Sequence, residues 1–155
     1  MPDEKPDNSV MFENVRRIYE QLPFNRYLGM NIVGLSPEEA GFTFDMRDEL
    51  IGNFVQGTLH GGVISAVLDT TGGMTATFSL IEKLRGLPAE EMINRIARIG
   101  TIDLRVDYLR PGRGTRFFSR GTIMRAGNKV AVTRMEIKNQ EQVLIAVGTG
   151  AYLIG

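Results

Sequence analysis

The first hydrophobic pattern of the chain has the period of a helix. Within residues 10–22, the apolar positions recur at helical spacing among charged ones. These apolar residues are Val15, Ile18, Tyr19 and Leu22. Apolar side chains three and four residues apart share one helix face, so we expect an amphipathic helix that Pro23 ends. Residues 1–9 are polar and contain two prolines. We expect a flexible N-terminus there, followed by a single domain over residues 10–155.

Several later segments are predicted to be strands, and in some of them apolar and polar residues alternate, which is typical of half-buried strands. A first strand is expected around Met30–Leu35. A second is expected where Phe42, Phe44 and Met46 alternate with polar residues. The last third predicts four more strands, over residues 101–108, 115–125, 130–138 and 142–154. Short turns join the last of these, which should therefore be antiparallel neighbours.

Two helical segments separate the early strands from the late ones. Residues 62–79 are apolar or small nearly all round, so this helix should be buried on most sides. Residues 87–99 are charged and amphipathic and predict a surface helix. The order of helix, two strands, buried helix, surface helix and four strands predicts an α+β fold. In it, an antiparallel sheet wraps around one long apolar helix.

Composition narrows the possible functions. The 155-residue chain is 43% apolar, which supports one domain with a core, and its net charge is zero. A neutral chain argues against nonspecific binding to nucleic acid or to anionic membranes. Without cysteine it has no disulfide, thiolate metal site or cysteine nucleophile, and one histidine cannot build a three-histidine zinc site. No signal-peptide core or convincing membrane span is apparent, so we expect a cytoplasmic protein without a metal or cofactor.

The most informative segment is the start of the buried helix. The chain's single histidine, His60, is followed by Gly61 and Gly62, and Asp69 lies inside the apolar stretch beyond them. A charge among apolar residues costs free energy unless it is paired. Free N–H groups at a helix start favour an anion or oxyanion, and glycines let a ligand approach them closely. A buried acid near such a start is what hydrolysis of an acyl bond needs.

Each of these residues also has a purely structural interpretation. The neighbours of Asp69 on its helix face are all small, namely Ser65, Ala66, Gly72 and Gly73. They can leave a groove for a ligand, or they can allow close packing around an acid bonded to a neighbouring element. His60 can be a helix cap, and Asn53 can be a turn residue or can orient a water or a substrate carbonyl. Nine residues separate His60 from Asp69, which excludes a direct His–Asp pair and a serine-type triad within one chain.

Basic and polar residues gather at two turns late in the chain. Arg125, Asn128 and Lys129 lie at a hairpin, and Arg110 and Arg113 flank Pro111. Charges at turns are usually solvated, but arginine also contacts phosphates in bidentate fashion. They are candidates for binding the phosphates of a substrate.

At these residues the chain resembles the hotdog-fold acyl-CoA thioesterases of the PaaI-like family, with a closer resemblance to the bacterial YigI-type branch. The resemblance covers roughly residues 24–154. It is carried by the segment Gly57-Thr58-Leu59-His60-Gly61-Gly62, by Asp69, by residues 100–112 and by residues 125–130. It implies a long helix wrapped by an antiparallel sheet, assembled as homodimers and often homotetramers with active sites at the dimer interface.

The resemblance also implies roles for individual residues. Asp69 matches the acidic position that acts as general base or nucleophile, and Gly61 matches the glycine whose N–H polarises the thioester carbonyl. His60 matches the adjoining histidine, with a role in orientation, and Thr101 falls where some members position the attacking water. Asn53 departs from the pattern, because three residues separate it from Gly57 where many members have two. The distance between Asp69 and Gly61 is no obstacle if they act together across a dimer.

We therefore expect hydrolysis of acyl-CoA thioesters, with medium or long acyl chains. Met74, Ala76 and Phe78, farther along the buried helix, either line an apolar tunnel for such chains or simply fill the core. Two other functions are kept as alternatives: an acyl-CoA-binding module without turnover, and an acyl-thioester hydratase or dehydratase. The intact Asp69 argues against the first. The single histidine beside two glycines argues against the second, because such enzymes commonly use a histidine with a carboxylate.

Overall fold

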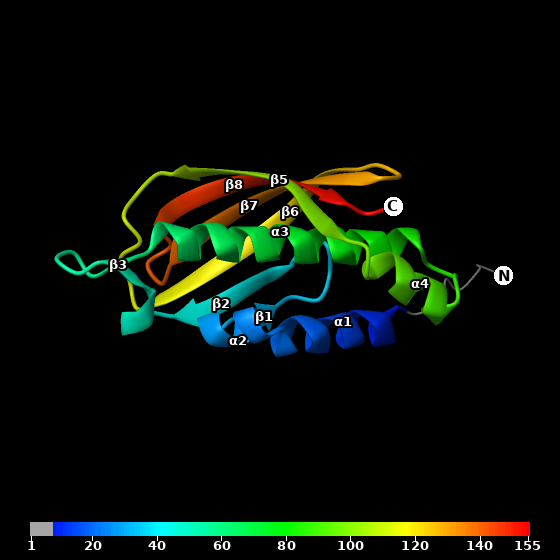
Figure 1. Cartoon of the computed structure of the whole chain (residues 1–155), viewed down its shortest axis with the longest axis horizontal. Helices are drawn as coiled ribbons and strands as arrows, with labels where there is room; N and C mark the ends of the chain where they lie inside the picture. Colours follow the sequence, from blue (N-terminus) through cyan, green and yellow to red (C-terminus); the bar gives the residue numbers. More distant parts are fainter. Residues whose placement is uncertain (1–7) are drawn as a thin grey trace.

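A curved antiparallel sheet wraps around one long helix in the computed structural model, which describes residues 8–155 (Figure 1). The helices are α1 (Ser9–Gln21), α2 (Pro23–Leu28), α3 (Gly61–Lys83) and α4 (Ala89–Ile96), with a short 3-10 turn at Asp48–Leu50. The strands are β1 (Asn31–Val33), β2 (Gly41–Asp45), β3 (Ile51–Asn53), β4 (Thr58–Leu59), β5 (Gly100–Tyr108), β6 (Arg116–Ala126), β7 (Val130–Asn139) and β8 (Leu144–Leu153). The predicted α+β class is confirmed.

Six strands form the main sheet in the order β1-β2-β6-β7-β8-β5, and every neighbouring pair is antiparallel. The two remaining strands, β3 and β4, pair with each other in a small separate hairpin. Strand β5 lies at one edge of the main sheet, so one of its sides has no strand partner among residues 8–155. The edge is long, because β5 runs for nine residues.

Helix α3 lies between the inner face of the sheet and helix α1. Alternate residues of β6, such as Phe117, Ser119 and Gly121, are buried toward it. The approach is close at Gly121, where an added Cβ would lie 2.1 Å from Oγ1 of Thr75 on α3. Helix α1 covers another side of α3, and the ring of Phe12 meets that of Phe78 edge-on at 5.3 Å. The core therefore surrounds α3 on most of its circumference, as its apolar sequence predicts.

The residues expected either to line a tunnel or to fill the core belong to the core. Met74, Ala76 and Phe78 each have 0% exposure and pack within the main apolar cluster. The core interpretation therefore holds for these three side chains.

Short elements differ most from the prediction. Helix α3 ends at Lys83, one turn beyond the predicted limit of residue 79. Pro23 follows the end of α1 as expected, but it also begins α2, a helix that the hydrophobic pattern did not predict. Proline is well suited to a first helical position because its fixed φ suits the helix and no N–H is needed there. The β3–β4 hairpin occupies part of the segment between the second strand and the buried helix, where no strand was predicted.

The predicted flexible N-terminus lies mostly outside the described residues. Asn8 and Ser9 fall within that predicted segment and are described. Asn8 is buried, and its Nδ2 donates a hydrogen bond to the carbonyl of Ile81 at 3.1 Å. Helix α1 begins at the next residue, Ser9. Asn8 thus joins the N-terminal segment to the end of α3.

Candidate active site

The start of α3 leaves one backbone donor free. His60 is the N-cap, and its Nδ1 accepts a hydrogen bond from the Gly62 N–H at 2.8 Å. The next N–H, that of Val63, donates to the His60 carbonyl at 3.0 Å. The Gly61 N–H finds no acceptor among residues 8–155. Because helix starts leave N–H groups unsatisfied and attract negative charge, Gly61 is the available donor for an oxyanion.

His60 acts as a cap, which is one of the two interpretations that its sequence position allows. A ring nitrogen that accepts a hydrogen bond carries no proton, so the proton of this neutral imidazole lies on Nε2. The side chain is exposed, and no carboxylate among residues 8–155 is paired with it. His60 therefore fixes the geometry of the helix start. Its side chain accepts from the Gly62 N–H, and the Gly61 N–H remains free.

A shallow hollow of about 330 Å³ opens beside this helix start. Tyr108, at the end of β5, donates its hydroxyl proton to the Gly61 carbonyl at 2.9 Å. Its ring lies 3.4 Å from where a Cβ on Gly61 would be. Ile64 and Arg110 also line the hollow. A ligand can thus reach the Gly61 backbone from the surface, with a guanidinium nearby.

Asp69 lies farther along α3 and is held by two hydroxyl groups from the sheet. Thr101 Oγ1, on β5, donates to Asp69 Oδ1 at 2.9 Å. Tyr152 Oη, on β8, donates to the same Oδ1 at 3.2 Å and to the Asp69 backbone carbonyl at 3.0 Å. Asp69 is partly exposed, and no lysine or arginine within residues 8–155 forms an ion pair with it. The carboxylate of Asp69 is therefore held by neutral donors alone within these residues.

The Tyr152 hydroxyl stays protonated and so remains a hydrogen-bond donor to the Asp69 carboxylate. Burial raises the pKa of the Tyr152 hydroxyl far above its ordinary value, and the charge of Asp69 and the hydrogen bond to it raise the pKa further. Tyr19 lies on the α1 side of α3 and bonds Thr77 at 3.1 Å, and burial raises its pKa as well. Both hydroxyls keep their protons throughout the neutral range.

Asp69 and Gly61 do not meet within one chain. Eight residues of a continuous helix separate them, which is about 12 Å along the axis. Thr101, by contrast, is brought directly to Asp69 from a position 32 residues later. One chain therefore carries an acid with its hydroxyl partners at one place and an anion-binding helix start at another.

Asn53 is engaged in its own turn. Its Oδ1 accepts hydrogen bonds from the N–H groups of Val55 at 3.0 Å and Gln56 at 3.1 Å. This is the turn interpretation of Asn53, and it occupies the oxygen that could otherwise have contacted a water. The hairpin stays close to the helix start, because the Leu50 carbonyl accepts from the His60 N–H at 2.8 Å.

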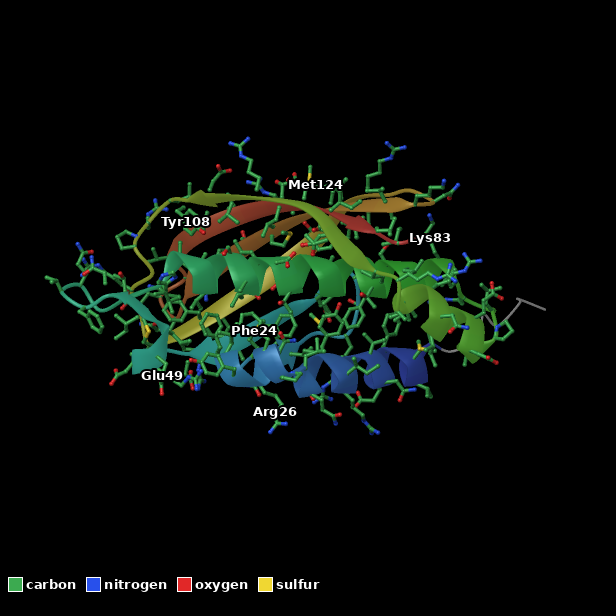
Figure 2. The ribbon with its side chains drawn as sticks, viewed as in Figure 1. Phe24, Arg26, Glu49, Lys83, Tyr108 and Met124 are labelled. Atoms are coloured by element: carbon green, nitrogen blue, oxygen red, sulfur yellow. The ribbon has the colours of Figure 1, made fainter. Side chains whose placement is uncertain are left out.

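The basic candidates fall into two groups at opposite ends of α3. Arg110 and Arg113 lie near its start, where Arg110 bonds the Leu144 carbonyl at 3.0 Å and Arg113 bonds Gln56 at 3.2 Å. The hairpin with Arg125, Asn128 and Lys129 lies at the far end, where Lys83 Nζ bonds the Gly127 carbonyl at 2.5 Å. Figure 2 shows Tyr108 and Lys83 toward these two ends. Helix α3 has 23 residues, so about 34 Å separates the groups within one chain.

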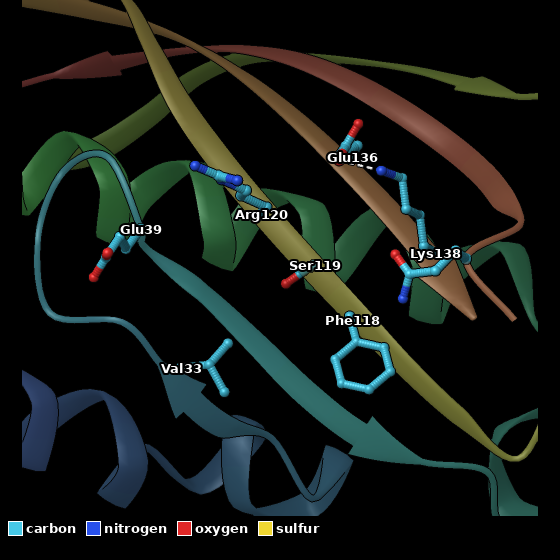
Figure 3. Close-up of a pocket in the computed structure, with 8 residues that line it drawn as sticks. Val33, Glu39, Phe118, Ser119, Arg120, Glu136 and Lys138 are labelled. Atoms are coloured by element: carbon cyan, nitrogen blue, oxygen red, sulfur yellow. Dashed lines mark ion pairs between the residues drawn. The ribbon is translucent and has the colours of Figure 1, made fainter. Parts of the chain in front are cut away.

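A second hollow, of about 410 Å³, lies on the other face of the sheet (Figure 3). Phe118, Arg120 and Lys138 line it, and Lys138 forms an ion pair with Glu136 at 2.9 Å. These side chains point away from α3, so this hollow contains neither Asp69 nor Gly61. None of the residues that the sequence singles out for chemistry lines it.

Two tyrosines of the site were not identified from the sequence. Tyr108 is the last residue of β5, and Tyr152 is the last but one of β8. In the sequence both look like ordinary strand residues. A buried tyrosine such as Tyr152 needs a partner for its hydroxyl, but Tyr108 is 53% exposed and gives no such signal. Within residues 8–155 no group of three or more histidine, cysteine or acidic side chains could hold a metal ion. No helix in the same range is long and apolar enough to cross a membrane.

Comparison with known proteins identifies the family of the chain. The model of the family described as the thioesterase superfamily matches residues 56–146. The medium/long-chain acyl-CoA thioesterase YigI of Escherichia coli K12 is 46% identical to this chain over 134 residues, which cover 86% of each of the two chains. A crystal structure from Shewanella oneidensis, described as related to the thioesterase superfamily, is 42% identical with a TM-score of 0.93, covering 97% of this chain and 99% of that one.

The Escherichia coli PaaI protein shares the fold, with a TM-score of 0.73 at 21% identity over 93% of this chain and 92% of that one. The predicted hotdog fold and the predicted family are both confirmed. The chain therefore belongs to the thioesterase superfamily, whose hotdog-fold members are thioester hydrolases.

Proposed function

We propose that this enzyme hydrolyses acyl-CoA thioesters to a free acid and CoA. One observation carries the assignment of its base: Asp69 is a partly exposed carboxylate held by two hydroxyls and by no cation. Asp69 takes a proton from a water as that water attacks the thioester carbonyl carbon. The C–S bond then breaks, and the CoA thiolate leaves. A positioned general base contributes typically about 10²–10⁴-fold.

Thr101 supports the attacking water in this proposal. Its single hydroxyl proton is donated to Asp69, so its oxygen lone pairs remain able to accept a hydrogen bond from water. The negative charge that develops on the carbonyl oxygen is stabilised by the Gly61 N–H. Such a donor contributes on the order of 10²–10³ in rate.

The complete site is proposed to form between two copies of the chain. Asp69 and Gly61 are about 12 Å apart along one helix, whereas a water bound to the base and an oxyanion donor must both reach one carbonyl group. An antiparallel pairing of two α3 helices places Asp69 of one copy beside Gly61 of the other. It also shortens the separation along the helix axis between the two groups of basic side chains, from about 34 Å within one chain to about 21 Å between the two chains. CoA phosphates are the proposed ligands of these groups.

Medium or long acyl chains are the proposed substrates. Support comes from the relative in Escherichia coli, whose name specifies medium/long-chain acyl-CoA. Each methylene that enters an apolar pocket adds about 0.8 kcal/mol of binding, roughly fourfold in affinity. We expect kcat/KM to rise with acyl length from acetyl-CoA upward until the pocket is filled. A flat profile, or a best rate with acetyl-CoA, would contradict this preference.

Both alternative functions fit the site less well. A binding module without turnover does not require a carboxylate such as that of Asp69, which two hydroxyl donors hold and no cation pairs within residues 8–155. A hydratase or dehydratase would need His60 paired with a carboxylate, but its Nδ1 caps α3 instead. No histidine other than His60 is present to replace it.

Hydrolysis of a series of acyl-CoAs, followed by release of the free thiol, tests the proposed function. Asp69→Asn keeps the shape of the side chain and removes the base, so we expect kcat to fall by about 10²–10⁴-fold. Thermal unfolding of the variant serves as the control for folding. Near-native turnover by folded Asp69→Asn would show that Asp69 is not the base.

A further inference from the structure

Tyr152 is the buried group in contact with Asp69 that neither the sequence nor the comparisons assign a role. It lies on β8 with 1% exposure, and its hydroxyl reaches α3 across the sheet–helix interface. The single hydroxyl proton is shared between the Asp69 backbone carbonyl at 3.0 Å and Oδ1 at 3.2 Å. It therefore ties the carboxylate to the helix backbone from which it projects.

Two glycines create the space for this hydroxyl. An added Cβ at Gly72 on α3 would lie 2.3 Å from Tyr152 Oη, and one at Gly150 on β8 would lie 2.7 Å from its ring. Real Cβ atoms do not approach other atoms this closely, so any larger residue would displace the tyrosine. The small residues beside Asp69 thus admit a specific donor on one side. They do not merely form an empty groove.

The two donors distinguish the two oxygens of the carboxylate. Thr101 Oγ1 and Tyr152 Oη both bond Oδ1, at 2.9 Å and 3.2 Å. The other oxygen, Oδ2, accepts no hydrogen bond from any residue between 8 and 155. An oxygen that already accepts two hydrogen bonds is a weaker base than one that accepts none.

We infer that Tyr152 is a positioning residue that, together with Thr101, holds Asp69 by Oδ1 and leaves Oδ2 as the oxygen that takes the proton from water. This inference rests on the proposed role of Asp69 as general base. Tyr152 touches neither water nor substrate in it. The hydroxyl restricts rotation of the carboxylate, which would otherwise exchange the two oxygens. Fixed orientation matters because a misplaced base loses much of its contribution to the rate.

Tyr152→Phe removes the hydroxyl and keeps the ring. We expect kcat for a medium-chain acyl-CoA to fall about tenfold, with KM changed less than twofold, because only the orientation of the base is lost. The matched control is Tyr19→Phe. It removes the hydroxyl of a partly buried tyrosine that packs on α3 but bonds Thr77 instead of Asp69. That variant should lose stability and keep its kcat.

The outcomes separate this inference from the proposed function. Suppose that Asp69→Asn is inactive while folded Tyr152→Phe keeps kcat within twofold of the unaltered enzyme. The role of Asp69 as general base is then supported, and the positioning role of Tyr152 is overturned. An equal fall of kcat in Tyr152→Phe and Tyr19→Phe would also overturn it, because that is the result of general loosening around α3. An active Asp69→Asn would instead reject the proposed function itself.

A pair of non-natural residues keeps the test decisive if Tyr152→Phe does not fold. Both 4-aminophenylalanine and 4-fluorophenylalanine at position 152 fill the place of the hydroxyl, but only the amino group donates a hydrogen bond. We expect kcat to be retained within about threefold with the amino group and to fall about tenfold with fluorine. Equal kcat for the two would contradict a positioning role.

Discussion

At the scale of single residues, the backbone N–H of Gly61 is the proposed donor to the oxyanion. Its N–H is left free because the next two N–H groups bond the side chain and the carbonyl of His60. The backbone of His60 has φ −61° and ψ 135°. This extended conformation is the one that a residue before proline adopts, and proline is well tolerated at the first position of a helix. The proposed donor can therefore be removed without breaking α3.

Replacing Gly61 by proline removes this donor. We expect Gly61→Pro to lower kcat by about 10²–10³-fold, the contribution of one oxyanion donor. Gly61→Ala is the matched control, since it keeps the N–H and its Cβ would lie at an ordinary 3.4 Å from the Tyr108 ring. Steady-state hydrolysis and thermal unfolding of both variants provide the measurement. Equal losses in the two variants would show that the N–H is not used.

Individual residues also show where sequence reasoning stops. Asp69 and Gly61 could be found because they lie close together in sequence on one helix, where spacing determines relative position. The donors to Asp69 come from residues 32 and 83 positions later, so these contacts depend on strand register and helix–sheet packing. Asn53 fits a turn equally well in sequence and structure, and its oxygen is used there.

At the scale of elements, long regular segments were predictable and short ones were not. Strands β5 to β8 each run for nine or more residues, and all four form close to their predicted limits. The β3–β4 hairpin has only three and two residues, and α2 has six, too few for a period to be recognised. Hydrogen bonds to neighbouring segments stabilise such elements, as where the Leu59 N–H of β4 donates to the Gly112 carbonyl at 3.0 Å.

The two basic groups make an element-scale prediction about CoA. We expect Arg125→Ala with Lys129→Ala, on the β6–β7 hairpin, to raise KM for acyl-CoA about threefold to tenfold and to change kcat less. Exposed charges contribute modestly to phosphate binding and do so before the transition state. Arg17→Ala with Arg26→Ala removes two exposed charges from α1 and α2 and serves as the control. An unchanged KM in the hairpin variant would place the CoA phosphates elsewhere.

At the scale of the whole molecule, the buried tyrosines link stability to alkaline pH. Burial raises the pKa of Tyr19 and of Tyr152 above their ordinary value of 10.0. Below about pH 10 these hydroxyls are protonated in the folded and unfolded chain alike. Above it the unfolded chain loses protons that the folded chain keeps, so the free energy of unfolding must fall as pH rises.

Urea denaturation between pH 8 and about 11.5 measures this effect, since unfolded tyrosine ionises near pH 10. The fall should approach about 1.4 kcal/mol per pH unit for each retained proton. Tyr19→Phe should make it shallower, whereas Tyr27→Phe, which alters a side chain 58% exposed, should leave it unchanged. The same alkaline slope in all three proteins would contradict the linkage.

Assembly is the other property of the whole molecule on which the proposed site depends. Strand β5 leaves a nine-residue edge without a partner among the described residues, and such edges are usually paired or protected. Asp69 and Gly61 of one chain lie too far apart to act on one carbonyl group. We therefore expect at least a dimer at micromolar concentration by light scattering. A monomer with full activity would contradict a site shared between two copies.

Mixing two inactive variants tests the shared site most directly. Asp69→Asn and Gly61→Pro are unfolded together and refolded as an equal mixture, so that about half of the dimers contain one chain of each kind. In such a dimer, one site combines the intact Asp69 of one chain with the intact Gly61 of the other. We expect hydrolysis to return to about a quarter of the unaltered activity. A mixture no more active than its separate components would contradict the claim that Asp69 and Gly61 act across a dimer interface.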